Sequence, residues 1–508
     1  MSGLSRRQWV FGGAAALAAA GFAAMRLGFL QEPQMGVDSA AYMAIGDILN
    51  RGGRLYADVW DQKPPGLYLF YQLIMDLWPT ARAAIVASLA AMGLNVLLLF
   101  GLTRKLLGPW AGLSAGWLLA VFTAVFWASA PNAEVFLLTL QLAALWLWLR
   151  EPGTVPSGGR ILLGGAALGV AFMVKYVVLL PAVGLAAWLV WAGGRDSRPG
   201  ARRRLGLFAA GWAAGAAPFA LYCLWQGVWG DFVAGTFGYN SGYVFRNAWE
   251  YFQQYGLGFI TGYFRQHWAL WVGAAAGLAV WFWRRPPATR SGAGDGSGLM
   301  LLWLLSSVAA VLAPLKFLDH YFLLVVPGLC FWTAYPLREG TPLGRLPRAV
   351  AAVALLAVSL PLAAIRTGES LDRWRHPGPD PAGDGYAPSA IGRYVESETT
   401  AADRIYVWRS LETDIYFYAH RRPASRIFFW PHLVREPAPP GGLAGVEAEF
   451  RAHPPAFLVV GDSPVYAERT LPFLDRMLAR DYSLDRVVEG NKIYRRKAPA
   501  LREPGAGE

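Results

Sequence analysis

Long apolar runs recur along most of this chain, and they constrain its fold more than any other feature of the sequence. Runs of about 20 apolar residues have the length that a helix needs to cross a bilayer, and the sequence repeats them as far as Arg366. The composition agrees, because 55% of the residues are hydrophobic and only 16% are charged, whereas a soluble chain of this length has more charge. The chain is therefore predicted to be a polytopic, mostly α-helical membrane protein.

The apolar runs predict about eleven membrane-spanning helices. The apolar stretch 161–193 is too long for one straight helix in the hydrocarbon, and Lys175-Tyr176 interrupts it. We therefore interpret this stretch as a tight hairpin of two helices with Lys175 at its tip. The predicted spans are residues 8–30, 83–102, 110–128, 134–149, 161–174, 177–193, 205–225, 268–283, 299–314, 321–337 and 349–366.

Basic residues are concentrated in alternate loops, in clusters such as Arg202–Arg204 and Arg284-Arg285. Cytoplasmic loops of membrane proteins carry this excess of Lys and Arg. The pattern predicts a cytoplasmic N-terminus and, with an odd number of spans, a first loop and a C-terminal segment on the opposite side. Orientation in the lipid bilayer thus accounts for the formal net charge of +12, and we expect no nucleic-acid partner. The abundance of Ala, Gly and Arg indicates a GC-rich bacterial source. We expect the protein to be a multi-pass protein of the cell inner (cytoplasmic) membrane.

The N-terminal segment "LSRRQWVFGGAAALAAAGFAAM" (4–25) has two interpretations. It resembles a twin-arginine export signal, and Ala16-Leu17-Ala18 would serve as its cleavage site. Alternatively, it is an uncleaved first span whose Arg6 and Arg7 hold the N-terminus inside. We favour the second interpretation because many further spans follow.

The C-terminal region differs in composition from the rest of the chain. The Pro- and Gly-rich segment "RHPGPDPAGDGYAP" (375–388) is typical of a linker. After it, we predict strands at "RIYVW" (404–408), "RIFFW" (426–430) and "AFLVV" (456–460), and a helix at "LPFLDRMLAR" (471–480). Continuous apolar strands that alternate with helices indicate a mostly parallel sheet covered on both faces.

The predicted fold class is a mostly α polytopic membrane helical bundle with a small C-terminal extracytoplasmic α/β domain. The boundaries follow the last apolar run and the linker. The predicted parts are a transmembrane domain at 1–366, a linker at 367–390, the extracytoplasmic α/β domain at 391–498 and a disordered tail at 499–508.

The first external loop, which follows the first span, carries an unusual number of charges. Asp38 precedes apolar residues at helical spacing, which predicts an amphipathic helix along the membrane surface. The simplest explanation of Asp38 is an N-cap, but a cap does not account for the rest of the loop. Lys63 stands directly before Pro64-Pro65, which fix the backbone and aim the lysine. A lysine at headgroup level suits a phosphate, and attraction to anionic lipid is the competing explanation.

Three more external loops carry polar residues at the same predicted face of the membrane. Asn132 and Glu134 stand at the start of the fourth span, Lys175 at the tip of the hairpin, and His320 and Tyr321 at the start of the tenth span. Each has an ordinary explanation, such as snorkelling of Lys175 or helix capping by His320. Together with the first loop, they predict acidic centres and phosphate-binding cations gathered at one membrane face.

These residues resemble membrane glycosyltransferases of the GT-C fold, in the glycosyltransferase family 39 branch that includes protein O-mannosyltransferases and the aminoarabinose transferases of lipid A. The resemblance extends over most of the chain. It rests on Asp38, "YADVWDQKPPG", "NAE", "GVAFMVKY", "YNSGYV", "HYFLLVVP" and the α/β region at the end.

The resemblance implies a reaction and a first set of roles. A hexosyl or pentosyl group would pass from a polyprenyl-phosphate-linked donor to a hydroxyl of a glycan, lipid or protein acceptor on the extracytoplasmic face. Asp38 would be the general base of an inverting displacement. Lys63, Lys175 and Tyr42 would bind the donor phosphate and stabilise its growing negative charge.

The resemblance also implies a second set of residues that would bind the acceptor or a cation: Glu134, Asn132, His320 and Tyr321. The spacing of the acidic and histidine side chains identifies no recognisable metal site. No cofactor is certain from the sequence, and a divalent cation stays an open alternative.

The sequence also departs from its relatives at the first-loop site. Many relatives have Asp-Glu there, and the aminoarabinose transferases continue with Pro-Arg, whereas Asp38 is followed by Ser39-Ala40-Ala41. The missing acid and arginine argue against assigning lipid A or protein as the acceptor by analogy. A polytopic transporter or lipid-linked sugar flippase without transferase activity is the alternative function, and a non-catalytic membrane scaffold is a third.

Overall fold

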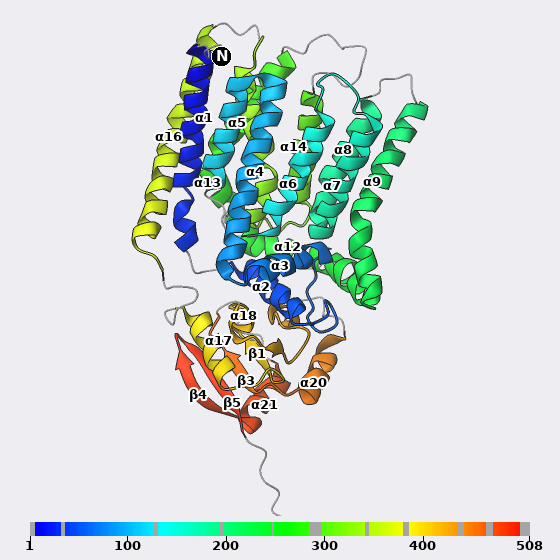
Figure 1. The fold of residues 1–508 in the computed structure, drawn as a ribbon, viewed down its shortest axis with the longest axis vertical. Helices are drawn as coiled ribbons and strands as arrows, with labels where there is room; N and C mark the ends of the chain where they lie inside the picture. Colours follow the sequence, from blue (N-terminus) through cyan, green and yellow to red (C-terminus); the bar gives the residue numbers. More distant parts are fainter. Residues whose placement is uncertain are drawn as a thin grey trace, which may run out of the picture.

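The computed structural model shows a bundle of long helices that stand side by side, with an α/β domain at one end of the bundle (Figure 1). The N-terminal helix begins at the end of the bundle that is distant from this domain. The structure describes residues 6–31, 36–124, 131–192, 198–245, 248–283, 296–340, 345–378, 386–434, 441–463 and 471–497.

A helix occupies each of the ranges that the apolar runs predict as spans. Four segments in the described part of the chain are long and apolar enough to cross a membrane by themselves: Gln8–Gln31, Ala81–Leu107, Pro199–Trp225 and Arg348–Arg375. The other helices are shorter, so the number of spans stays a prediction. The helices of the bundle are α1 (Arg6–Ala24), α4 (Ala81–Leu107), α5 (Pro109–Thr123), α6 (Ala133–Trp148), α7 (Gly158–Val174), α8 (Leu179–Trp191), α9 (Arg198–Trp225), α13 (Leu257–Trp283), α14 (Ser297–Leu312), α15 (Val326–Ala334) and α16 (Arg345–Arg375).

Close packing inside the bundle depends on small residues. A Cβ atom added to Gly169 of α7 would lie 2.2 Å from the carbonyl oxygen of Trp212 in α9. Such an approach of two backbones is typical of membrane helices, where small residues let the helices pack closely. The hairpin predicted at 161–193 is confirmed, because α7 ends at Val174 and α8 begins at Leu179, with the short 3₁₀ helix η3 (Tyr176–Val178) between them.

The first loop forms two helices, α2 (Val37–Asn50) and α3 (Pro65–Leu77), which lie between the bundle and the α/β domain (Figure 1). The predicted helix is present, but its expected exposure at the membrane surface was wrong, because every residue from Ser39 to Leu49 is buried. Helix α3 and helix α18 (Ile415–Ala419) of the α/β domain both pack against α2. The N-cap is Gly36 and no side chain caps the helix, so the explanation of Asp38 as a cap was wrong.

The segment between α9 and α13 contains short helices that the sequence interpretation left unassigned. Two of them are π-helical turns, which are rare and occur mostly as single turns within helices. They are α10 (Trp229–Val233), η4 (Ala234–Tyr239), α11 (Asn240–Phe245), α12 (Ala248–Tyr251) and η5 (Phe252–Gly256). Three 3₁₀ helices complete the helical part: η1 (Leu27–Gln31), η6 (Asp319–Leu324) and η7 (Tyr335–Leu337).

The α/β domain contains a sheet with the strand order β2-β1-β3-β5-β4. Strand β1 pairs in parallel with β2 and β3, whereas β5 pairs antiparallel with both β3 and β4. The strands are β1 (Arg404–Trp408), β2 (Arg422–Pro423), β3 (Phe457–Val460), β4 (Tyr482–Val488) and β5 (Asn491–Arg496), and the further helices are α17 (Ala387–Ser397), α19 (Pro431–Val434), α20 (Gly442–Ala452) and α21 (Pro472–Asp481).

Two expectations about this domain were wrong. Residues 426–430 form no strand, because the backbone there leads from β2 into α19. The sheet is mixed rather than mostly parallel, because β4 and β5 form a hairpin. Its turn has left-handed backbone angles at Glu489 and Gly490, with φ of 46° and 83°, as hairpin turns require.

The last helix of the bundle extends beyond the last apolar run. Helix α16 continues to Arg375, through the first part of the predicted linker. Helix α17 begins at Ala387, still within the predicted linker, while residues 379–385 of that linker and the predicted disordered tail at 499–508 lie outside the described residues.

Candidate active site

Lys63 is the centre of a cluster of charged side chains at the end of the bundle that meets the α/β domain. Its Nζ atom lies 3.8 Å from Oδ2 of Asp38 and 3.8 Å from Oδ2 of Asp61. The ammonium group also lies 4.8 Å from the ring centroid of Tyr42, at the distance of a cation–π contact. The hydroxyl of Tyr42 donates a hydrogen bond to Oδ2 of Asp38 at 3.1 Å, because residues four apart share one face of α2.

The backbone around Lys63 is held from several sides. The hydroxyl of Tyr56 donates a hydrogen bond to the Lys63 carbonyl at 2.7 Å, and the Lys63 amide donates one to the hydroxyl of Tyr68 at 3.2 Å. Helix α3 begins with Pro65 in its first turn, where proline fits best. A Cβ atom on Gly66 would lie 2.5 Å from the carbonyl oxygen of Met173. Glycine at this position therefore lets the Lys-Pro-Pro loop approach the end of α7, close to Lys175.

A second cluster forms around Glu134 at the start of α6. The Lys175 ammonium group donates a hydrogen bond to Oε1 of Glu134 within a buried ion pair. Nε2 of His320 lies 3.9 Å from the same oxygen, and the Lys175 ammonium lies 4.4 Å from the ring centroid of Tyr321. Glu134 thus holds together Lys175 and His320, which come from different loops.

The two clusters act on Asp38 together. Burial opposes its ionisation, but the charges of Lys63, His320 and Lys175 outweigh that effect and hold the pKa of Asp38 below its ordinary value. The side chain of Asp38 is 36% exposed, whereas those of Lys63 and Glu134 are 10% and 1% exposed. Asp38 is therefore an ionised carboxylate whose side chain is partly exposed, whereas the cations next to it are largely buried.

Asn132 lies beside this group as part of its framework. Its Oδ1 atom accepts a hydrogen bond from the hydroxyl of Ser39 at 3.3 Å, and the hydroxyl of Tyr71 donates one to the Pro131 carbonyl. These contacts tie the start of α6 to α2 and α3. The structure thus brings together all the residues that the sequence proposed for the site, and their chemical roles stay a prediction.

The sequence interpretation missed two residues of the cluster. Asp61 appears in the sequence interpretation only within the motif "YADVWDQKPPG", with no role assigned to it, and His432 does not appear there. Nε2 of His432, in α19 of the α/β domain, lies 3.3 Å from Oδ1 of Asp61. Burial opposes the ionisation of Asp61, but the charge of Lys63 and the hydrogen bonds from His432 and the Gln62 backbone amide outweigh it and lower the pKa of Asp61. No local sequence signal marks His432, since the contact joins residues that are 371 positions apart.

The segment "YNSGYV" (239–244) supports the first loop from another side. Nδ2 of Asn240 donates hydrogen bonds to the carbonyls of Gln62 at 2.6 Å and Thr236 at 2.9 Å. The hydroxyl of Tyr176 donates to Oδ1 of Asn240 at 3.0 Å. Asn240 therefore connects the residue before Lys63 with the residue after Lys175.

No group of three or more His, Cys, Asp and Glu side chains suited to hold a metal ion occurs in the described part of the chain. The cations next to Asp38 and Glu134 are instead the side chains of Lys63 and Lys175. The arrangement supplies what a phosphate-binding site needs, which is fixed positive charge in a setting with little water.

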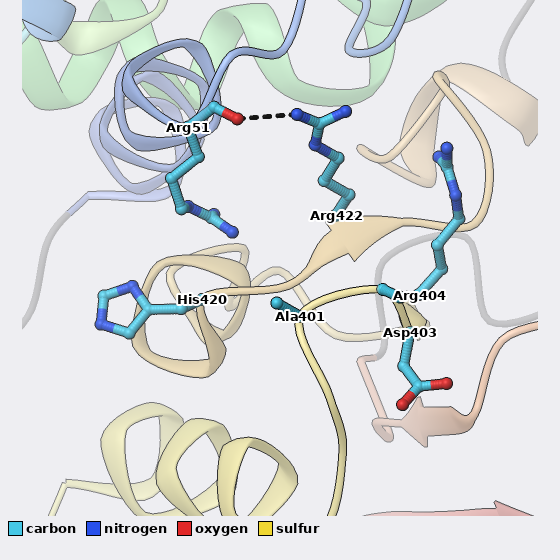
Figure 2. A pocket seen from close by; sticks show the side chains of 7 residues that line it. Arg51, Ala401, Asp403, Arg404, His420 and Arg422 are labelled. Atoms are coloured by element: carbon cyan, nitrogen blue, oxygen red, sulfur yellow. Dashed lines mark hydrogen bonds between the residues drawn. The ribbon is translucent and has the colours of Figure 1, made fainter.

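A separate cavity of about 400 Å³ lies where the C-terminal end of α2 meets the α/β domain. Figure 2 shows Arg51 and His420 on one side of this cavity and Arg404 and Arg422 on the other. An Nη2 atom of Arg422 donates a hydrogen bond to the Arg51 carbonyl at 2.7 Å, which is the dashed line in Figure 2. The cavity marks the seam between the two parts of the chain.

Comparisons with known proteins agree with this architecture. A family model described as dolichyl-phosphate-mannose-protein mannosyltransferase matches residues 62–221, and no curated protein matches the chain. The structure is similar to ArnT from Cupriavidus metallidurans bound to undecaprenyl phosphate, with a TM-score of 0.63 and 17% identity over 96% of this chain and 98% of that one. It is also similar to the archaeal oligosaccharyltransferase AglB from Archaeoglobus fulgidus in complex with an inhibitory peptide and a dolichol-phosphate. There the TM-score is 0.56, with 13% identity over 97% of this chain and 75% of that one. The chain is therefore a multi-pass membrane protein with the GT-C fold of the membrane glycosyltransferases.

Proposed function

We propose that this protein transfers a hexosyl or pentosyl group from a polyprenyl-phosphate-linked donor to an acceptor hydroxyl on the extracytoplasmic face of the membrane. The observation that carries the proposal is the partly exposed carboxylate of Asp38, 3.8 Å from the ammonium group of Lys63. The similarity to a structure bound to undecaprenyl phosphate supports the class of donor. The acceptor would be a glycan, a lipid or a protein.

The acceptor side of the reaction depends on Asp38. Its lowered pKa keeps the carboxylate ionised at neutral pH, so it can take the proton of the acceptor hydroxyl as a general base. The freed oxygen attacks the anomeric carbon and forms the new C–O bond. The bond from that carbon to the phosphate oxygen breaks, and its electron pair leaves with the polyprenyl phosphate. A single displacement of this kind inverts the configuration at the anomeric carbon.

The donor side depends on Lys63. Its ammonium group lies next to Asp38, so a phosphate bound there would place the anomeric carbon beside the base. The charge that grows on the leaving phosphate is stabilised by a cation that the fold has already oriented. Tyr42 contacts both Asp38 and Lys63, so it fixes the carboxylate and the ammonium group relative to each other.

Lys175 and Glu134 contribute in a different way. Glu134 is almost fully buried and paired with Lys175, so we assign it to orientation of Lys175 rather than to direct contact with the acceptor. Lys175 then adds positive potential to the phosphate site. His320, with 20% of its side chain exposed, and Tyr321 face the acceptor side of the cluster in this scheme.

The orientation in the membrane follows from the charges of the loops. Arg and Lys predominate in the loops that we place in the cytoplasm, which puts the α/β domain and the site of transfer outside the inner membrane. A donor whose lipid tail lies in the bilayer would reach the site laterally, with its phosphate at headgroup level.

Purified protein incubated with a panel of labelled polyprenyl-phosphate sugars tests the function. We expect one donor to lose its label to an acceptor in membrane extracts, with inverted anomeric configuration in the product. Movement of the intact donor across vesicle membranes without any transfer would instead support the flippase alternative.

A further inference from the structure

The α/β domain places one buried histidine inside the charged cluster of the first loop. His432 is 1% exposed, and its Nε2 atom lies 3.3 Å from Oδ1 of Asp61. Its other ring nitrogen, Nδ1, lies 3.0 Å from the hydroxyl of Tyr239. The rings of Trp60 and Phe429 also contact it, with centroid distances of 5.3 Å and 5.2 Å. His432 is therefore fixed in position and in orientation.

One tautomer of the neutral ring satisfies both polar contacts. The hydroxyl of Tyr239 donates to Nδ1, and the N–H group at Nε2 donates to Oδ1 of Asp61. The Gln62 amide donates to the same oxygen at 2.6 Å. Oδ1 of Asp61 is thus occupied by two donors, and Oδ2 is the oxygen that lies 3.8 Å from the Lys63 ammonium.

This arrangement determines how close the Lys63 ammonium group lies to each of two carboxylates, Asp38 and Asp61. The ammonium group lies at equal distances of 3.8 Å from Asp38 and Asp61. A buried carboxylate that loses a hydrogen-bond donor regains stabilisation by drawing the nearest cation closer. Removal of the His432 donor would therefore pull Lys63 toward Asp61, away from Asp38 and from the place where the donor phosphate must bind.

We propose that His432 is a positioning residue of the donor-phosphate site, which acts through Asp61 to hold Lys63 beside Asp38, so that the α/β domain completes the site. This inference rests on the proposed transfer from a polyprenyl-phosphate donor. It predicts that the α/β domain contributes to donor binding as well as to the stability of the chain.

The competing explanation is that His432 only attaches the α/β domain to the bundle. Other contacts at the same boundary do not involve Asp61. Arg426 pairs with Asp231 at 2.9 Å, and Arg422 donates to the Arg51 carbonyl at 2.7 Å. A variant at Arg422 therefore weakens the attachment of the domain while leaving the contacts of Lys63 in place.

The test compares His432→Phe, which keeps an aromatic ring but removes both polar contacts, with Arg422→Gln as the matched control. Donor KM, kcat and the affinity for undecaprenyl phosphate are measured for full-length protein, together with Tm. We expect His432→Phe to raise the donor KM and weaken undecaprenyl phosphate binding by about tenfold, the equivalent of 1.4 kcal/mol. Arg422→Gln should leave both values near those of the wild type, even where its Tm falls.

Two further variants keep the inference testable if His432→Phe folds poorly. His432→Gln retains an N–H donor and should restore part of the donor affinity. Asp61→Asn removes the carboxylate that would draw Lys63 away from Asp38, so its combination with His432→Phe should recover most of the donor affinity that His432→Phe loses.

The outcomes separate this inference from the proposed function. An active wild type in which His432→Phe and Arg422→Gln change donor KM equally would reduce His432 to a docking contact and overturn the inference. A wild type that transfers no sugar from any donor would refute the proposed function. In that case, equal binding of undecaprenyl phosphate by wild type and His432→Phe would overturn the inference as well.

Discussion

The Nζ atom of Lys63 lies 3.8 Å from Oδ2 of Asp38, although the two residues are on different elements of the first loop. Helix α2 carries Asp38 in its first turn, and the turn before α3 carries Lys63. A base for the acceptor and a cation for the donor phosphate are thus held side by side at the end of the bundle.

Replacement of Lys63 by Gln removes the cation assigned to the donor phosphate. Charge-assisted hydrogen bonds contribute about 1.5–3 kcal/mol, so we expect undecaprenyl phosphate to bind about 10-fold to 100-fold more weakly. Titration of the purified protein with this lipid measures the change. Lys492→Gln, at an exposed position of β5, is the control and should bind as the wild type does. If Lys63→Gln bound undecaprenyl phosphate as tightly as the wild type, Lys63 would not be a residue that binds the donor phosphate.

The buried pair of Glu134 and Lys175 should respond differently to single and double substitutions. Lys175→Met leaves the carboxylate of Glu134 buried without its closest cation, which costs about 3–5 kcal/mol of unfolding free energy. Glu134→Gln combined with Lys175→Met removes both charges and should recover most of that stability. Denaturation in detergent measures both effects.

Transfer should not recover in the same double variant. The Lys175 charge helps to keep the pKa of Asp38 low, and it is absent in both variants. Stability and activity that return together in the double variant would show that the pair serves only the fold.

The seam between the two parts of the chain should depend on pH through His420. Nδ1 of His420 lies 3.9 Å from Oδ2 of Asp47, and this interaction raises the pKa of His420 against the opposing effect of burial. Glu396 also favours the charged ring, whereas Arg51 opposes it. A raised pKa in the fold means that the stabilisation is complete below the ordinary pKa of about 6.5. It is lost as the pH rises through the folded value.

Limited proteolysis between about pH 5 and pH 8 measures this dependence, with release of the α/β domain as the readout. We expect the domain to be released faster as the pH rises, and we expect His420→Gln to remove that dependence. A release rate that depends on pH equally in wild type and His420→Gln would assign the effect to another group.

Much of the helical part could be predicted from the sequence because apolar length alone determines where a membrane helix can form. The hairpin around Lys175 followed from the same rule, because a polar residue interrupts a run that is too long for one span. The Lys-Pro-Pro turn was predictable too, since proline restricts the backbone locally. The gathering of Asp38, Glu134 and His320 followed from the placement of their loops on one membrane face.

The remaining features depend on the contact between the two parts of the chain. Helix α2 has an amphipathic pattern, and only the docking of α18 reveals that its outer face is covered. His432 lies after an apolar segment that resembles a strand, and its contact with Asp61 exists only in the assembled fold. The β4–β5 hairpin, in contrast, has a local signal at Glu489-Gly490 that a closer examination of turn residues would find.

Sugar transfer by Asp38→Asn, measured beside Asp76→Asn at an exposed position of α3, tests the central claim most directly. Loss of a general base lowers the rate by about 10²-fold to 10⁴-fold, and we expect a loss of this size in Asp38→Asn with undecaprenyl phosphate binding retained. Asp76→Asn should transfer as the wild type does. Transfer by Asp38→Asn at a rate close to that of the wild type would contradict the assignment of Asp38 as the base.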